Sequence, residues 1–462
     1  HRENEKDNSA PRPERQPLRD DELYLKAEQL TSDADVSVRM AAIAYLVEHT
    51  TVRHQDVLDR HLENPDAEWS GTVLVHLAKA LQNNPRLKKK FKMRQRLEKR
   101  LDQLAGIPAG RRRFLQKIYI IKAIGTARIE SMYPTLSGFF TDDNPAVVRQ
   151  ALWAAGKTRA PYFVPTLLRF MDQPAFSRMA KKSLEKYGRK LIPVLRELYR
   201  QQVDESQLIR KLPAAIKRVG DPKGISLLFD LLQYPNAAVR QQSLEVLSDL
   251  HFQHPDWRFR KSKVSMEILD EVLRYQRTLG MWCAQRNAAA MEEGRVREAR
   301  QRVVQLLHKK LRSQLDNIFY LLSLRYSREH LTVILKGLKS RKPKLKLTAL
   351  EFLDNLLDLR LKRVLIPLFE VSLLRKATTK GLRQLDIPVP DAYSCLRDQL
   401  NSGRELRLKI ATLHLIGELR DERYLPLVDD CLQYNDPELR LFAENIRSIL
   451  IPRLIAHTGD AA

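Results

Sequence analysis

The sequence predicts an all-α fold, a right-handed α-α superhelix of stacked helix pairs into which a long helical hairpin is inserted. Three observations predict it. Four glycines, Gly125, Gly156, Gly188 and Gly220, recur at intervals of 31, 32 and 32 residues, and a period of this length is typical of repeat arrays. Apolar residues precede each glycine at helical spacing. Glycine is scarce, at 16 of 462 residues, and the alternation typical of strands is absent. We expect roughly eight to ten helix pairs.

The first helix of each pair is predicted to end at its glycine. The residues one, four and five positions before the glycine are mostly apolar or small, which places them on one helical face. Glycine adopts the left-handed conformation without a steric penalty, so it commonly follows the last helical residue. In the first two copies the buried face is expected to contain Ile120, Ile121, Ile124, Ala151, Leu152 and Ala155.

The second helix of each pair is predicted to begin at a proline that is followed two residues later by an apolar residue. Proline suits the first turn of a helix because its missing N–H has no intrahelical acceptor there. The fourth copy carries Ser226 in place of the proline. The other copies begin at Pro134, Pro165, Pro193, Pro367 and Pro426.

The start of the first helix also recurs. Asp35, the Asp143-Asn144 pair, Asn236 and Asp436 are each followed within a few residues by a Val or Leu and then an Arg. Short polar side chains at this position cap the free N–H groups of a helix. Together with the Pro-x-Leu second helix, this pattern resembles the HEAT repeat over most of residues 33–250 and 341–452. The resemblance implies an architecture for binding partners and no particular chemistry.

The period fails between about residues 251 and 340. Residues 251–257 are predicted to form a loop, residues 264–291 and 295–324 two long helices with a turn near Gly294, and residues 329–338 short helices. The predicted organisation is therefore a disordered linker at 1–20, repeat arrays at 21–250 and 341–462, and a helical insertion at 251–340. Insertions in repeat proteins often carry function, and a packing elaboration that bends the array explains this stretch equally well. If the chain encodes a specific activity, residues 251–340 are where it is expected first.

A narrower resemblance rests on the runs Ile318–Tyr326, Ala349–Leu357 and Leu365–Leu368. They are similar to segments of bacterial proteins that fuse a membrane domain similar to ADP/ATP translocases to a cytoplasmic HEAT array. The similarity spans about residues 130–450. It implies a cytoplasmic module at the inner membrane, preceded by a transporter-like domain. The polar start at His1 is consistent with a chain cut from a longer polypeptide.

No catalytic, cofactor or metal residues are predicted. Cys283, Cys395 and Cys431 are widely separated and odd in number, which argues against a disulfide scaffold. Glycine-rich phosphate loops and nucleophile motifs are absent. The paired acids Asp142-Asp143 are interpreted as caps or solvated groups. We therefore expect a non-catalytic scaffold or regulatory module that binds a protein partner on a concave surface.

The charge is the main indication of a partner. Lys and Arg number 81 against 56 Asp and Glu, a net charge of +25, which favours anionic partners. A solvated basic face on long helices is the first interpretation. An anionic membrane surface comes second, because it suits a domain tethered beside a membrane. Nucleic acid comes third, since few aromatics interleave the basic runs to stack on single-stranded bases. A basic DNA glycosylase for alkylated bases ranks last. The residues predicted to meet an anionic partner are Lys88, Lys89, Lys90, Arg94, Arg96, Arg111, Arg112 and Arg113.

Overall fold

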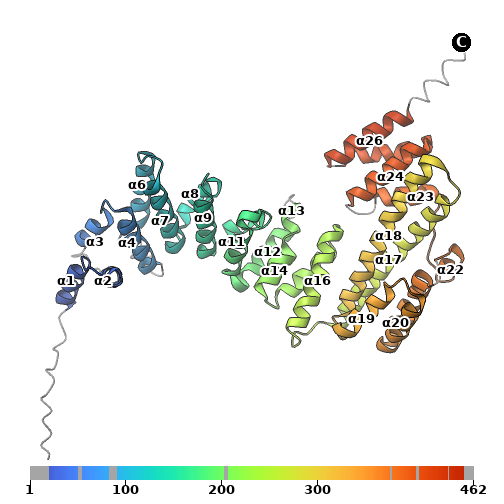
Figure 1. Cartoon of the computed structure of the whole chain (residues 1–462), viewed down its shortest axis with the longest axis horizontal. Coiled ribbons are helices and arrows are strands. Elements are labelled where there is room, and N and C mark those ends of the chain that lie inside the picture. The colour runs from blue at the N-terminus through green and yellow to red at the C-terminus, as the bar shows by residue number, and fades with distance from the viewer. Residues whose placement is uncertain are drawn as a thin grey trace, which may run out of the picture. The chain divides into compact units, whose positions relative to one another are not determined.

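The computed structural model describes residues 20–49, 55–82, 91–201, 206–374, 377–401, 405–434 and 436–451. Within these ranges the chain is helical and contains no strand, which confirms the all-α prediction (Figure 1). The chain divides into two compact units, residues 1–194 and 195–462. Each unit is described by itself below. The predicted linker at 1–20 lies outside the described residues except for Asp20, where the first helix begins.

The first unit is a series of helices of 6 to 17 residues that alternate with short turns. Short 3₁₀ helices lie beside the second helices of the pairs, namely η2 (Glu130–Met132), η3 (Phe139–Thr141), η4 (Pro161–Phe163) and η5 (Gly188–Lys190). The α-helices are α1 (Asp20–Leu30), α2 (Val36–Glu48), α3 (Gln55–Leu62), α4 (Ala67–Leu81), α6 (Met93–Ala105), α7 (Arg111–Ala127), α8 (Tyr133–Gly138), α9 (Pro145–Thr158), α10 (Val164–Phe170) and α11 (Pro174–Glu185).

The longer helices of the first unit pack in succession, α4 on α7, α7 on α9 and α9 on α11. The predicted apolar face is confirmed, because Ile121, Ile124, Ala151 and Leu152 are all fully buried. This face is continuous from one helix pair to the next. Burial of each large aliphatic side chain contributes about 1.5–3 kcal/mol, so the stack is held mainly by neighbour-to-neighbour contacts.

Two of the four periodic glycines do not end their helices. Gly125 and Gly156 lie inside α7 and α9, which continue to Ala127 and Thr158. The left-handed residue follows three positions after each glycine and is Arg128 or Arg159, with φ of 55° and 56°. The prediction of a terminating glycine was therefore wrong for these two copies. Here the absent Cβ makes room for the next helix.

The prediction holds at the other two glycines. Gly220 is the left-handed cap of α14 (Leu212–Val219), with φ of 59°. Gly188 follows α11 with φ of 52°. Nothing lies within 4 Å of a Cβ built on either residue. At these positions the backbone conformation, and not close packing, favours glycine.

The predicted helix starts are confirmed. Asp35, Asn144, Asn236 and Asp436 are the N-caps of α2, α9, α16 and α26, and each side chain accepts a hydrogen bond from a free N–H group of the first turn. The prolines of α8, α10 and α25 also lie in the first turn, as predicted. Pro367 does not, since it lies near the end of its helix.

The second unit contains the two longest helices. Helix α12 (Leu191–Arg200) contains the division between the units. The helices that follow are α13 (Ser206–Ile209), α14 (Leu212–Val219), α15 (Gly224–Leu231), α16 (Ala237–Gln253), α17 (Lys261–Ala289), α18 (Gly294–Leu322), α19 (Arg328–Leu338), α20 (Pro343–Leu356), α21 (Leu359–Phe369), the π-helix η6 (Glu370–Leu374), α22 (Thr379–Arg383), α23 (Ala392–Asn401), α24 (Leu406–Leu419), the 3₁₀ helix η7 (Glu422–Tyr424), α25 (Leu425–Leu432) and α26 (Pro437–Leu450).

Helices α17 and α18 form the predicted long hairpin and pack along each other. The predicted loop at 251–257 begins later than expected, because α16 extends to Gln253. Pro367 lies inside α21, and the π-helix η6 follows. Helix α21 already begins at Leu359, after its N-cap Asp358, so the expected helix start at Pro367 was wrong.

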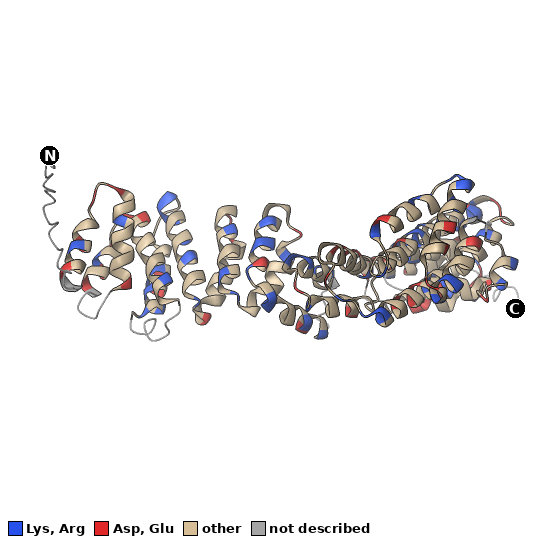
Figure 2. Cartoon of the chain, turned by 90° about the horizontal axis from the view of Figure 1, so that it is seen from below, with Lys and Arg blue, Asp and Glu red and all other residues tan. Residues whose placement is uncertain are grey.

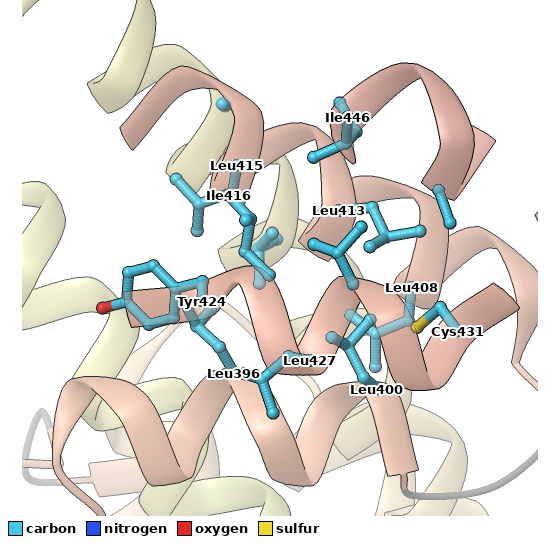
Figure 3. Close-up of a cluster of buried hydrophobic side chains, with 14 of the residues drawn as sticks. Leu396, Leu400, Leu408, Leu413, Leu415, Ile416, Tyr424, Leu427, Cys431 and Ile446 are labelled. Atoms are coloured by element: carbon cyan, nitrogen blue, oxygen red, sulfur yellow. The ribbon is translucent and has the colours of Figure 1, made fainter. Parts of the chain in front are cut away.

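The hairpin supports the core of the second unit. Helix α18 packs on both α16 and α24, while α23 contacts α17 and α24. Figure 3 shows the apolar side chains that fill the space between these C-terminal helices, including Leu396, Leu413, Ile416 and Cys431. Cys431 is buried among them. No helix in the described part of the chain combines enough length and apolar character to cross a bilayer.

Candidate functional site

A polar pocket of about 400 Å³ lies in the first unit, where α3, α4, α6 and α7 meet. Its wall contains four cations and one carboxylate, Glu63. The cations are Arg96, Lys99, Arg100 and Arg112. This is the described cavity that contains residues predicted from the sequence to meet an anion, so it is the candidate functional site.

The helical repeat of α6 places three of the cations together. Arg96, Lys99 and Arg100 are separated by three and four residues, and Gln103 continues the same row. Residues at this spacing project from one face of a helix. On α7, Arg112 and Gln116 are four residues apart and complete the opposite wall.

Two of the four guanidinium and ammonium groups are held in place by their neighbours. Arg96 donates from Nε to the carbonyl of Phe91 at 2.8 Å, and its Nη1 lies 2.5 Å from Oδ1 of Asp59. Arg100 donates from Nη2 to the carbonyl of Leu62. These contacts fix both side chains with their remaining N–H groups available at the pocket wall. A rigid donor set of this kind lowers the entropy cost of binding an anion.

The other two cations are less constrained. Lys99 pairs with Glu63 at 3.1 Å, and both side chains are exposed. Arg112 is exposed and has no ion pair among the described residues. Oε1 of Gln116 is buried and lacks a hydrogen-bond partner in the same part of the chain. The pocket therefore combines two donors that are held by neighbouring groups and two that are exposed.

The positive charge of Arg100 is destabilised by its surroundings in the pocket. Burial lowers the pKa of Arg100, the neighbouring charge of Arg96 lowers it further, and Glu63 opposes the change. A cation that is partly removed from water beside like charges gains stability when an anion arrives. The arrangement is suited to holding a carboxylate or phosphate, and it contains no acid, base and nucleophile set among the described side chains.

Of the eight residues predicted to meet an anion, only some line the pocket. Arg96 and Arg112 line the pocket, whereas Lys88, Lys89 and Lys90 lie outside the described residues. The remaining three do not line it. Arg94 pairs with Glu98 at 2.7 Å on α6, Arg111 is exposed at the start of α7, and Nε of Arg113 is buried without a partner in the described chain.

Lys99 and Arg100 were not among the predicted residues. The signal that could have found them is their spacing of three and four residues from Arg96 on a predicted helix. The density of positive charge alone gave Arg94 the same rank as Arg96, although Arg94 lies on another face of α6. Helical periodicity within a basic run is therefore more informative than the run itself.

Asp142, interpreted from the sequence as a cap or solvated group, has a structural role. Asp142 pairs with Lys117 at 2.5 Å and its Oδ1 accepts the N–H of Asn144. His254 stacks on Trp257, with ring centroids 4.2 Å apart. In the described ranges no three His, Cys, Asp or Glu side chains come close enough to hold a metal ion. Figure 2 shows Lys and Arg on helices of both units, with Asp and Glu interspersed.

No protein-family model matches the sequence, and no curated protein shows significant similarity to it. The resemblances to the HEAT repeat and to the translocase-like fusion proteins stay predictions.

Proposed function

We propose that the chain is a non-enzymatic, HEAT-type interaction module whose basic pocket in the first unit binds an acidic segment of a partner protein. The observation that carries the proposal is the convergence of Arg96, Lys99, Arg100 and Arg112 on one pocket with a single carboxylate in its wall. A charge-assisted hydrogen bond to such a group contributes about 1.5–3 kcal/mol.

The shape of the pocket favours a protein segment over a flat anionic surface. The side chain of Arg96 is only 25% exposed, and Arg100 is held against the backbone of Leu62. A bilayer surface reaches the exposed Lys99 and Arg112 more easily than it reaches these recessed groups. A projecting Asp, Glu or phosphorylated side chain can enter the pocket, which all four cations line.

The finer architecture belongs to the same proposal. The serial packing of α4, α7, α9 and α11 supports a right-handed superhelix of helix pairs, whose successive second helices present a surface to the partner. The resemblance of residues 318–326 and 349–357 supports a cytoplasmic location beside a translocase-like membrane domain. An acidic cytoplasmic segment of a membrane protein is a partner of the required chemistry.

Binding of a fluorescently labelled peptide of alternating Glu and Ser to the full chain tests the proposal. The double variant Lys99→Gln/Arg112→Gln removes the two exposed positive charges of the pocket. The control Arg94→Gln/Arg111→Gln removes the same charge from the same two helices, outside the pocket. We expect the first variant to weaken binding by about 10- to 100-fold and the control to change it less than about threefold.

Competitors separate the alternatives. Anionic vesicles and duplex DNA are expected to bind the protein through charge that is distributed over its surface. Both double variants should therefore lower the affinity of the protein for vesicles and for DNA to the same extent. Equal loss of peptide binding in the two variants would show that net charge, and not the pocket, attracts the peptide. That result would overturn the proposed site.

A further inference from the structure

A second polar cavity, of about 660 Å³, lies within the second unit. Its wall comes from the start of α16, the middle of α17 and α18, the segment 388–390 and the end of α23. Four cations and two carboxylates face it. The cations are Arg240, Arg274, Arg277 and Lys310, and the carboxylates are Asp398 and Glu405.

The carboxylates in and under the wall are already occupied. Glu271, buried beneath the cavity, accepts from Arg274 at 3.2 Å and from Nδ2 of Asn317 at 2.9 Å, which occupies both of its oxygens. Glu405 pairs with Lys310 at 3.3 Å. Glu271 and Glu405 are therefore committed to two of the four cations, and Asp398 pairs with Arg397, outside the cavity wall, at 3.4 Å.

Arg240 and Arg277 are left without a carboxylate at ion-pair distance in the described part of the chain. Arg240 is largely buried, and its one hydrogen bond runs from Nη1 to the carbonyl of Tyr234 at 3.4 Å. Its Nε is buried and has no partner among the described residues. Burial, followed by the nearby charge of Arg274, lowers its pKa, while the charges of Glu271 and Glu405 oppose the change. A largely buried cation with no direct ion pair is costly, so this position favours an anion.

Two further groups face the same space. Gln314 is 5% exposed, lines the cavity, and its Oε1 has no hydrogen-bond partner in the described residues. Helix α16 begins at Ala237 in the cavity wall, after its N-cap Asn236. The positive end of the helix dipole favours an anion there, while Gln314 offers a polar contact for a hydroxyl or amide of the same ligand.

From this cavity we propose that the second unit binds a small phosphate-bearing anion, with Arg240 and Arg277 as its main ligands. Planar guanidinium groups match phosphate oxygens in bidentate geometry, and three of the four cations are arginines. The volume is within the range of small-molecule sites, about 300–1,000 Å³. This site is separate from the basic pocket of the first unit and does not depend on a protein partner.

Titration calorimetry of the full chain with inorganic pyrophosphate, at constant ionic strength, tests the proposal. We expect saturable binding of the wild-type protein and at least tenfold weaker binding for Arg240→Met and Arg277→Gln. Arg302→Gln is the control, because Arg302 is exposed on α18 and does not line the cavity; it should bind as the wild type does. Absence of saturable binding, or equal weakening in the control, would overturn the proposal.

Two measurements keep the result interpretable. Without ligand, Arg240→Met should unfold at the wild-type temperature or above it, since the substitution removes a largely buried cation that has no direct ion pair among the described residues. A lower unfolding temperature would show that Arg240 is a structural counter-charge and would contradict its assignment as a ligand. Citrate at the same ionic strength should bind at least tenfold more weakly than pyrophosphate, and equal affinity would contradict the phosphate class.

Discussion

Gly125 of α7 lies against Ala154 of α9, so closely that a Cβ added to Gly125 would be 2.6 Å from the Cβ of Ala154 and 2.7 Å from its Cα. The contact repeats one helix later, where a Cβ on Gly156 would be 2.6 Å from the Cβ of Ser183. At Gly125 and Gly156 the period of the glycines is thus the period of a close approach between successive first helices.

The first prediction concerns this contact. Gly125→Ala should destabilise the first unit by about 2 kcal/mol. The added Cβ would meet the backbone of Ala154, so the overpacking cost is expected near the upper end of the typical range, about 3 kcal/mol, and only about 1 kcal/mol is regained in helix propensity. Gly138→Ala is the matched control, since Gly138 is helical and nothing lies within 4 Å of its built Cβ. Chemical denaturation measures both variants. A Gly125→Ala protein as stable as the Gly138→Ala protein would contradict the close approach.

A second prediction concerns the buried amine of Lys186. Its Nζ lies 4.6 Å from the ring centroid of Trp153 and has no hydrogen-bond partner in the described chain. Burial, with the charge of Lys157 in addition, lowers the pKa of Lys186 from 10.5 to about 8. Charged Lys186 therefore opposes folding most strongly below pH 8, and stability is regained as the pH rises from about 8 towards 10.5.

Lys186→Met tests this sign. The variant should be more stable than the wild type at pH 7 by about 1 kcal/mol, a figure reduced for the partial exposure of the amine. Because the wild-type amine loses its proton, the difference should narrow at pH 9. Urea denaturation at the two pH values measures it. A difference that stays constant would show that Lys186 does not titrate in this range.

A third prediction concerns the thiols. Cys283, Cys395 and Cys431 are free and buried, and burial raises the pKa of Cys395 and of Cys431 to about 11. The thiolate is the reactive form, so a maleimide reagent at pH 8 should label the native protein slowly and all three residues after unfolding. Rapid labelling of the native protein would contradict the packing of the C-terminal core.

The sequence was sufficient for much of the local structure. The caps Asp35 and Asn236 and the long helices around Gly294 follow from side-chain chemistry and periodicity within a single segment. Gly125 was misassigned because its role depends on Ala154, which lies 29 residues further along the chain. Nothing local distinguishes a glycine that caps a helix from one that admits a neighbour.

The sites divide in the same way. The shared helix face of Arg96, Lys99 and Arg100 could have been predicted from the sequence, since it depends only on spacing within one helix. The cavity around Arg240 was not, because its wall joins α16 to the segment at Pro388, and the two are separated by more than a hundred residues. Packing decides which Lys and Arg side chains lack an ion-pair partner, whereas the composition gives only the total number of Lys and Arg residues.

Charge reversal tests the proposed function most directly. In Lys99→Glu/Arg112→Glu the pocket should lose the acidic peptide and bind a peptide of alternating Lys and Ser, whereas Arg94→Glu/Arg111→Glu, with the same net charge, should keep the acidic peptide. Fluorescence anisotropy with the two labelled peptides measures both affinities. The account predicts a switch of preference by at least tenfold in the pocket variant alone. The same preference in both variants would contradict it.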